Sequence, residues 1–196
     1  SRRQRQMCIR DSIVGVDLIR TGKDDFYVLE DNCRTPSGVS YMLENREIMM
    51  KMFPDLFHSN RVLRVDDYPT RLLQTLMSLA PKKCESSVPT VVLLTPGHLN
   101  SAYYEHTFLS DQMGIEMVEA QDLFVENDFL YMKTVDGPKK IDVVYRRIDD
   151  DYLDPLAYNP NSVIGVPGIT HVYKTGGVNI CSAPGAGIAD DKAVYI

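Results

Sequence analysis

A strand, a helix and a second strand follow one another in the middle of the chain, and this order constrains the fold more than any other feature. Residues 90–95 are a short continuous apolar run, which is typical of a buried strand in a parallel sheet. Pro96-Gly97 then turns the chain into a helix expected over residues 101–114, and residues 115–118 have the pattern of another strand. Because parallel strands need a crossover connection, the sequence predicts a βαβ unit in an α/β fold.

The loop after the first of these strands is a candidate ligand site, because ligands of open parallel sheets bind beyond the carboxyl ends of the strands. Asn100 in this loop is a candidate for substrate binding, and His98 can reach a ligand from the same loop. His106 lies in the middle of the expected helix, where a surface or hydrogen-bonded histidine is the usual interpretation. The loop has one glycine and no lysine, so it is a weak phosphate motif.

Two strand-like runs near the start of the chain, residues 13–20 and 26–32, are joined by a polar turn and predict a β-hairpin. Glu30 and Asn32 are two residues apart on an extended strand and therefore point to the same side. Antiparallel pairing brings Asp17 close to them, giving three oxygen donors that suit Mg²⁺ or Mn²⁺. The alternative is that the carboxylates form the solvent face of an ordinary amphipathic hairpin.

The loop at residues 34–38 has the composition of a site for an anionic group. It combines the permanent charge of Arg34, a proline-stiffened turn, the hydroxyl of Ser37 and a glycine, Gly38, that permits close backbone approach. A helix expected over residues 40–53 begins directly afterwards, so its N-terminal amides can face the same anion. The alternative is that Ser37 and Gly38 only start this helix.

The remaining elements follow from apolar periodicity and turn residues. Ser40 is a candidate N-cap, and a short connection over residues 55–64 leads to a helix that opens near Asp66. The further expectations are an alternating hairpin over residues 122–133, a turn at 135–138, a strand at 141–145, a loop with a short helix over 161–175 and a strand at 178–181.

The densest mixture of opposite charges in the chain directly follows the strand expected at residues 141–145. Adjacent guanidinium groups can bind a carboxylate, and the neighbouring carboxylates can orient them or meet the ammonium group of an amine substrate. The candidates for substrate binding in this run are Arg146, Arg147, Asp149 and Asp150. A solvated, internally paired turn is one alternative. A two-metal hydrolase is another, although no histidine ligand lies nearby.

Composition excludes several classes of function. The formal charge of −6, from 21 basic and 27 acidic residues, argues against a nucleic-acid-binding surface, and the one basic cluster is Arg2-Arg3-Gln4-Arg5. No apolar run reaches the roughly 20 residues that span a bilayer, and no signal segment opens the chain, so a soluble cytoplasmic protein is expected. The scattered cysteines, which indicate neither zinc nor disulfides, are Cys8, Cys33, Cys84 and Cys181.

Five stretches together resemble a known family, the circularly permuted ATP-grasp proteins related to glutathionylspermidine synthetase. They are GVDLIR, VLEDNCRTPSGVSYMLENR, LTPGHLNSAYYEHTFLSDQMG, VYRRIDDDYLDPLAY and APGAGIADDKAVY, and the resemblance extends from Ile13 to Ile196. In addition, a hairpin that ends in Glu-x-Asn, with an aspartate on the preceding strand, resembles the metal-binding hairpin of ATP-grasp ligases.

The resemblance implies three regions: part of the metal-binding ATP-grasp lobe at residues 1–54, a Rossmann-like pre-ATP-grasp domain at 55–182, and the start of the ATP-binding lobe at 183–196. In this third region Asp190-Asp191-Lys192 would open a helix. The charged start and the apolar end of the chain lead us to expect a fragment of a longer protein. The lysines that hold nucleotide phosphates are then expected in a downstream segment.

The compact turn at residues 183–187 leads into that lobe and can line its nucleotide cleft, or its small residues can simply allow a tight crossing of the chain. The residues implied to contact the ATP cofactor are Ser37, Gly38, Gly185, Gly187 and Lys192.

For function, the resemblance implies an ATP-dependent ligase for a small-molecule carboxylate and an amine. ATP would phosphorylate the carboxylate, and the amine would attack the acyl phosphate, releasing ADP and phosphate. Asp17, Glu30 and Asn32 would hold Mg²⁺, and Arg34 would stabilise the transferred group. The fragment alone is expected to be inactive. A non-catalytic ligand-binding or scaffold module is the alternative, and contact with a neighbouring enzyme or a second copy of the chain also stays open.

Overall fold

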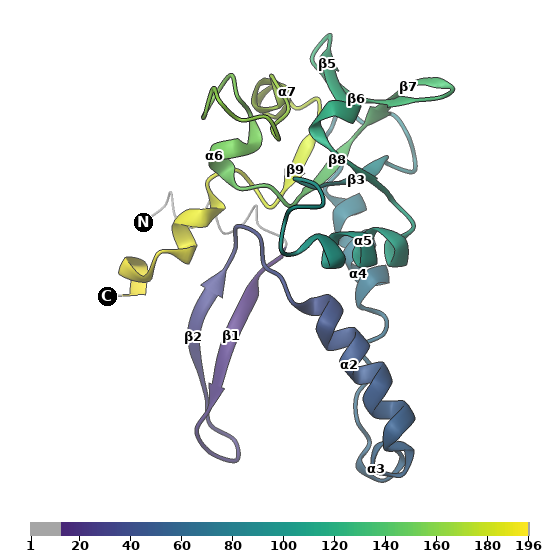
Figure 1. Cartoon of the computed structure of the whole chain (residues 1–196), viewed down its shortest axis with the longest axis vertical. Helices are drawn as coiled ribbons and strands as arrows, with labels where there is room; N and C mark the ends of the chain where they lie inside the picture. Colours follow the sequence, from purple (N-terminus) through teal and green to yellow (C-terminus); the bar gives the residue numbers. More distant parts are fainter. Residues whose placement is uncertain (1–12, 196) are drawn as a thin grey trace.

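The structure is a computed structural model that describes residues 13–195 (Figure 1). Cys8 and the cluster Arg2-Arg3-Gln4-Arg5 lie outside the described residues. The chain forms an α/β structure, as predicted, in which a β-hairpin and a helical arm extend from a body of sheets and helices. Within the described residues, no helix is long and apolar enough to cross a membrane.

The predicted N-terminal hairpin is confirmed. Strands β1 (Gly15–Arg20) and β2 (Phe26–Asn32) pair in antiparallel register, and Asp17 lies directly opposite Glu30. The register shifts by one residue immediately after Asp17. Directly opposite residues of an antiparallel pair share one face, so the expected carboxylate pair is formed.

The helical arm contains more helix than the sequence indicated. Helix α2 (Val39–Met52) is followed at once by α3 (Pro54–Asn60), where we had expected a connection over residues 55–64. Pro54 occupies the first turn of α3, a position at which its missing N–H costs nothing. The predicted N-cap at Ser40 is wrong: Gly38, with φ of 109°, precedes the helix, and Ser40 is buried inside the first turn.

The centre of the body is a four-stranded parallel sheet in the order β4-β3-β8-β9. Its strands are β3 (Val91–Leu94), β4 (Glu116–Val118), β8 (Val143–Arg146) and β9 (Asn179–Cys181). Helix α5 (Tyr103–Met113) joins β3 to β4, so the predicted βαβ unit is confirmed. The short helix η1 (Ala120–Asp122) follows β4.

A second, antiparallel sheet has the order β5-β6-β7, formed by β5 (Leu123–Glu126), β6 (Phe129–Thr134) and β7 (Gly137–Ile141). The strand expected at residues 141–145 is therefore divided between two sheets. The break falls at Asp142, whose Oδ2 accepts a hydrogen bond of 2.9 Å from the N–H of Thr90.

Both faces of the parallel sheet are covered, which explains the continuous apolar run of β3. Val92 and Leu94 pack into a core with the antiparallel sheet and α7 (Ile169–Thr175). Val91 and Leu93 pack on the opposite side against α5 and α4 (Tyr68–Ser78), the helix predicted near Asp66.

The rest of the chain runs past the end of the sheet. Helix α6 (Asp150–Leu153) follows β8, and the short helices η2 (Ala186–Asp190) and η3 (Lys192–Tyr195) follow β9. The three residues Asp190-Asp191-Lys192, expected together to open one helix, are instead divided: Asp190 ends η2, and Lys192 begins the separate short helix η3. The η2 segment lies beside β2.

Candidate functional site

The loop at residues 33–38 leaves the β1–β2 hairpin and crosses the carboxyl end of the parallel sheet, where two cavities flank it. The first, here called the sheet-edge cavity, has a volume of about 310 Å³. The second, the glycine-turn cavity, has a volume of about 470 Å³. Most of the residues predicted from the sequence line one of these cavities or lie on the hairpin.

The hairpin presents three oxygen-bearing side chains on one face. Asp17 is exposed, whereas Glu30 and Asn32 are half-buried. Two carboxylates and an amide are hard oxygen ligands that fit Mg²⁺, which is usually held through one or two protein carboxylates. In the described part of the chain no group of three or more His, Cys, Asp or Glu could hold a metal. Lys192 Nζ lies 3.3 Å from Glu30 Oε2, so Glu30 has a cationic partner within the chain.

Arg34 lies where the hairpin meets the glycine turn. Asp190 accepts hydrogen bonds from the N–H of Cys33 at 2.6 Å and of Arg34 at 3.3 Å, which fixes the backbone of the loop. Arg34 Nε is buried, lies 4.0 Å from Asp190 Oδ2 and makes no hydrogen bond within residues 13–195. A Cβ atom added to Gly187 would come within 2.2 Å of this nitrogen, so the guanidinium packs directly on the glycine backbone.

Arg147 holds the same loop from the sheet. It donates to the Pro36 carbonyl at 2.7 Å, to the Tyr145 hydroxyl at 3.1 Å and to Ser37 Oγ. Its Nη2 also lies 3.3 Å from Glu105 Oε1. Burial raises the pKa of Tyr145 to about 12. The phenol therefore stays protonated beside Arg147 across the ordinary pH range.

Glu105 was not singled out from the sequence, yet it organises this region. It lies on α5, is 1 % exposed, and its Oε2 accepts hydrogen bonds from Gly38 N at 2.7 Å, Ser40 N at 3.1 Å and Ser40 Oγ at 2.9 Å. A carboxylate from a neighbouring helix thus satisfies the first amides of α2, and its negative charge suits the positive end of the helix dipole. The N–H groups of Gly38 and Ser40 therefore bind Glu105, and not an anion beside Arg34 as the sequence suggested.

His106 is buried and hydrogen-bonded, so of the two positions considered for it the hydrogen-bonded one is confirmed and the surface one is not. Its Nδ1 lies 2.9 Å from Thr95 Oγ1. Burial, and to a smaller extent the Arg147 guanidinium, lower the pKa of His106 to about 4. The imidazole is therefore neutral near pH 7. His98 is exposed and lines neither of the two cavities.

Arg146 and Arg147 are 1 % and 3 % exposed, which rules out a solvated turn. Arg146 donates to the carbonyls of Ser182 at 2.6 Å, Ile148 at 2.7 Å and Ala183 at 3.3 Å, and its Nη2 lies 2.7 Å from Asp150 Oδ1. It therefore ties the end of β8 to the glycine turn.

The structure brings most predicted residues together in three groups. The hairpin face carries Asp17, Glu30 and Asn32, with Lys192 beside them. The glycine-turn cavity is lined by Arg34, Asp150, Gly185 and Gly187. The sheet-edge cavity is lined by Ser37, Asn100, Arg147 and Asp149. Gly38 and Arg146 line neither cavity and support the loop and the turn instead.

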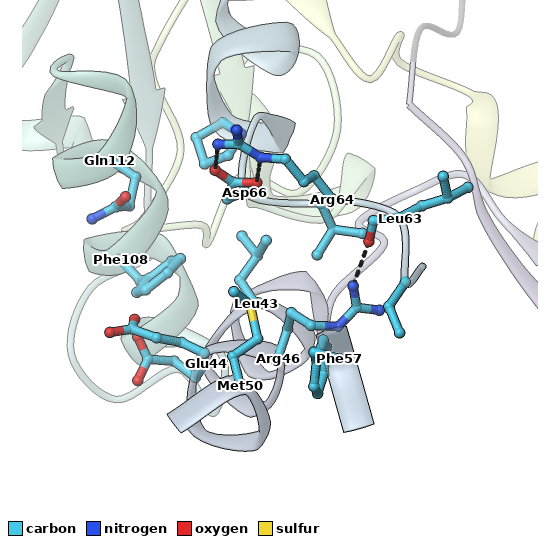
Figure 2. Close-up of a pocket in the computed structure, with 14 residues that line it drawn as sticks. Leu43, Glu44, Arg46, Met50, Phe57, Leu63, Arg64, Asp66, Phe108 and Gln112 are labelled. Atoms are coloured by element: carbon cyan, nitrogen blue, oxygen red, sulfur yellow. Dashed lines mark hydrogen bonds and ion pairs between the residues drawn. The ribbon is translucent and has the colours of Figure 1, made fainter. Parts of the chain in front are cut away.

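Another cavity, of about 590 Å³, lies between the helical arm and helices α4 and α5 (Figure 2). Its surface is largely apolar, with Leu43, Met50 and Phe108 among the lining residues. Figure 2 shows that its two arginines are engaged locally: Arg46 donates to the Leu63 carbonyl, and Arg64 pairs with Asp66. None of the predicted site residues lines it, so the sheet edge is the stronger candidate for chemistry.

Comparison with known proteins gives a family and several relatives. A family described as a circularly permuted ATPgrasp matches residues 6–196. The chain is 52 % identical over 183 residues to an uncharacterized protein of Synechocystis, covering 93 % of this chain and 38 % of the relative. It is 50 % identical over 187 residues to an uncharacterized protein of Mycobacterium tuberculosis, covering 95 % of this chain and 34 % of that protein.

A third relative, from Frankia alni, carries the name "Putative glutamate--cysteine ligase 2-3". It is 37 % identical over 187 residues, which cover 95 % of this chain and 22 % of the relative. In all three comparisons the chain spans well under half of the relative's length.

Proposed function

The chain belongs to the circularly permuted ATP-grasp family, and from this premise we propose that it is part of an ATP-dependent ligase that joins a carboxylate to an amine. The proposed reaction proceeds through an acyl phosphate and requires Mg²⁺. The observation that carries the proposal is that one loop, residues 33–38, connects the oxygen-bearing face of the hairpin to both cavities.

The chemistry requires positioning and charge neutralisation more than acid–base catalysis. A substrate carboxylate oxygen attacks the terminal phosphorus of ATP and ADP leaves. The neutral amine nitrogen then attacks the acyl carbon, and the phosphate leaves as hydrogen phosphate with the proton that the amine loses. Mg²⁺, when bound, supplies neutralisation of charge on the phosphates, and Asp17, Glu30 and Asn32 would hold it. The loop and the cavities then place the reacting groups.

Arg34 is the residue of this chain proposed to stabilise the transferred phosphoryl group. Its guanidinium lines the glycine-turn cavity, and its Nε has no hydrogen-bond partner in the part of the chain that the structure describes. Gly187 permits this position because no side chain fills the space under the guanidinium. A permanently charged planar donor in a partly buried site is well suited to phosphate oxygens.

The Frankia alni relative supports the reaction class. Its printed name is that of a glutamate--cysteine ligase, and this chain covers 22 % of that protein. We therefore use the name as support for the class of reaction and not for the identity of the substrates.

A non-catalytic binding module is the second candidate, and the ion pair between Lys192 and Glu30 favours it. A lysine 3.3 Å from the carboxylate gives Glu30 a partner that does not require a metal. Lys192 is 84 % exposed, however, so solvent screens the pair and a divalent cation can displace it.

The test is ADP release by the full-length protein with Mg²⁺, ATP and pools of carboxylates and amines. We expect release that needs both pools and is abolished by Glu30→Gln, because an amide removes one anionic metal ligand. Glu116→Gln, at an exposed position of β4, is the matched control. Full activity in Glu30→Gln would contradict the metal site. The absence of release from correctly folded protein would favour the binding module.

A further inference from the structure

The inner wall of the sheet-edge cavity carries a hydrogen-bond donor that the protein leaves available. His106 is 1 % exposed and lines the cavity, with Nδ1 2.9 Å from Thr95 Oγ1. The N–H of Gly97 donates to the same hydroxyl oxygen at 3.2 Å. We assign the hydroxyl proton to the bond with His106 Nδ1, which leaves the imidazole proton on Nε2. The Nε2–H group is then the ring donor for a ligand.

Arg147 adds positive charge to this wall. Its side chain is buried, and within the described residues its Nε meets no hydrogen-bond acceptor. Among the described residues, the Glu105 carboxylate compensates the charge through one contact of 3.3 Å, because its other oxygen accepts three hydrogen bonds from Gly38 and Ser40. A buried cation with unused donor capacity is uncommon in proteins and indicates a missing acceptor.

The rim of the same cavity carries the opposite charge. Asp149 lines the cavity, precedes α6 and is exposed. Asn100 lies on the α5 side, where its Oδ1 accepts a hydrogen bond of 2.9 Å from Ala102 N and its amide N–H groups remain for a ligand. Pro96 and Ile164 supply apolar surface. The cavity therefore separates donors and positive charge on the inner wall from a carboxylate at the rim.

We propose that the sheet-edge cavity binds an α-amino acid, with the α-carboxylate held by His106, Arg147 and Asn100 and the ammonium group held by Asp149. This rests on the proposed ligase function and names the class of its amine substrate. A volume of about 310 Å³ is at the small end for ligand cavities and suits one amino acid.

Ligands with a single kind of charge fit the cavity less well. A simple carboxylate leaves Asp149 without a partner, and a polyamine leaves the donors of His106 and Arg147 without an acceptor. Asp149 and Asp150 are consecutive residues that line different cavities. The ammonium end of the amino acid therefore lies on the side nearest the glycine-turn cavity, which assigns the amino acid as the amine substrate.

Binding is tested by calorimetry on the full-length protein without ATP, using the twenty protein amino acids as probes. We expect at least one to bind with Kd below about 1 mM. The N-acetyl derivative of the best binder lacks the ammonium group and its primary amide lacks the carboxylate, so each should bind at least about tenfold more weakly. Binding by none of the amino acids, or equal binding by either derivative, would overturn the proposal.

Two substitutions of His106 separate ligand binding from folding. His106→Gln keeps an N–H donor near the position of Nε2, whereas His106→Asn keeps a partner for Thr95 and lacks the reach to the ligand. We expect about tenfold weaker amino acid binding in His106→Asn and a change within about threefold in His106→Gln. His171→Asn, at an exposed histidine on α7, is the matched control. Wild-type binding in His106→Asn would overturn the role of His106.

The outcomes also distinguish this proposal from the ligase itself. Amino acid binding by a protein that never releases ADP would support the cavity assignment and contradict the ligase. ADP release with amines that lack a carboxylate, together with no amino acid binding, would support the ligase and overturn the cavity assignment.

Discussion

Arg147 and Glu105 form a buried ion pair, with 3.3 Å between Nη2 and Oε1 and with both side chains 1 % exposed. Arg147 follows β8 of the parallel sheet, and Glu105 lies on α5. Because Glu105 also accepts hydrogen bonds from Gly38 and Ser40, the pair joins the first turn of α2 to the edge of the sheet.

Glu105→Ala should therefore destabilise the protein strongly. The substitution leaves the Arg147 charge buried without its carboxylate and removes the acceptor for the first amides of α2. We expect the free energy of unfolding to fall by about 3–5 kcal/mol, measured by chemical denaturation of the full-length protein. Glu116→Ala, at an exposed position of β4, should change it by less than about 0.5 kcal/mol. A loss in Glu105→Ala as small as in this control would contradict the structural role.

Gly187→Ala should impair ligation by displacing Arg34. The new Cβ would lie 2.2 Å from Arg34 Nε, so the guanidinium must leave its position over the glycine turn. We expect the rate of ADP release at saturating substrates to fall by at least about tenfold, because the proposed phosphoryl contact is made by this group. A Cβ atom added at Gly22, in the hairpin turn, would contact only the exposed Asp25 side chain, so Gly22→Ala should retain activity. Equal rates in the two variants would argue against a role for Arg34.

Local patterns in the sequence were sufficient to predict the hairpin and the βαβ unit. Strand alternation placed Glu30 and Asn32 on one side, and a polar turn between two runs of strand residues implied the antiparallel partner that carries Asp17. The apolar run before Pro96 was buried on both faces, as a central parallel strand requires. These features depend on apolar residues that recur every two positions in a strand and every 3.6 positions in a helix, and a single sequence shows such periods.

The buried polar residues near the end of the sheet could not be predicted from such local patterns. Glu105 and His106 lie in the first half of helix α5, and charged and polar residues on a helix usually face solvent. Glu105 binds the N-terminus of α2, which is about 65 residues away in the sequence, and His106 binds Thr95 at the end of β3. Adjacent Arg146 and Arg147 likewise resemble a solvated turn, because their acceptors are carbonyls of distant segments.

Helix α3 was missed for a different reason. Pro54 ends a helix pattern when it is read from the preceding residues, yet proline also fits the first turn of a new helix. The sequence rule is therefore ambiguous at this position. The structure resolves it, because α2 ends at Met52 and α3 begins at Pro54.

Removing Lys192 should strengthen divalent metal binding to the hairpin in the absence of nucleotide. Lys192 Nζ competes with a cation for Glu30 Oε2, but an exposed ion pair contributes only about 0.2–1 kcal/mol. We therefore expect Lys192→Met to raise Mn²⁺ affinity by less than about fivefold, measured by electron paramagnetic resonance of free Mn²⁺. Lys174→Met, in the last turn of α7, is the control. Weaker Mn²⁺ binding in Lys192→Met would show that the lysine does not compete for the site.

His106 should make the stability of the protein depend on pH between about 6.5 and 4. Burial lowers its pKa from the ordinary value of 6.5 to about 4, so within this range the unfolded chain binds a proton that the folded protein does not. The contribution of neutral His106 to the free energy of unfolding is therefore fully present above pH 6.5. It decreases as the pH falls, and by pH 4 the loss is about 3 kcal/mol at most.

His106→Asn cannot take up this proton, so its unfolding free energy should decrease less steeply than that of the wild type over the same range. The measurement is chemical denaturation at several pH values, with His171→Asn as the control for other titrating groups. Equal slopes in His106→Asn and the wild type would mean that His106 takes up its proton at the same pH in the folded protein as in the unfolded chain. A charged imidazole would then face Arg147 in the cavity at low pH.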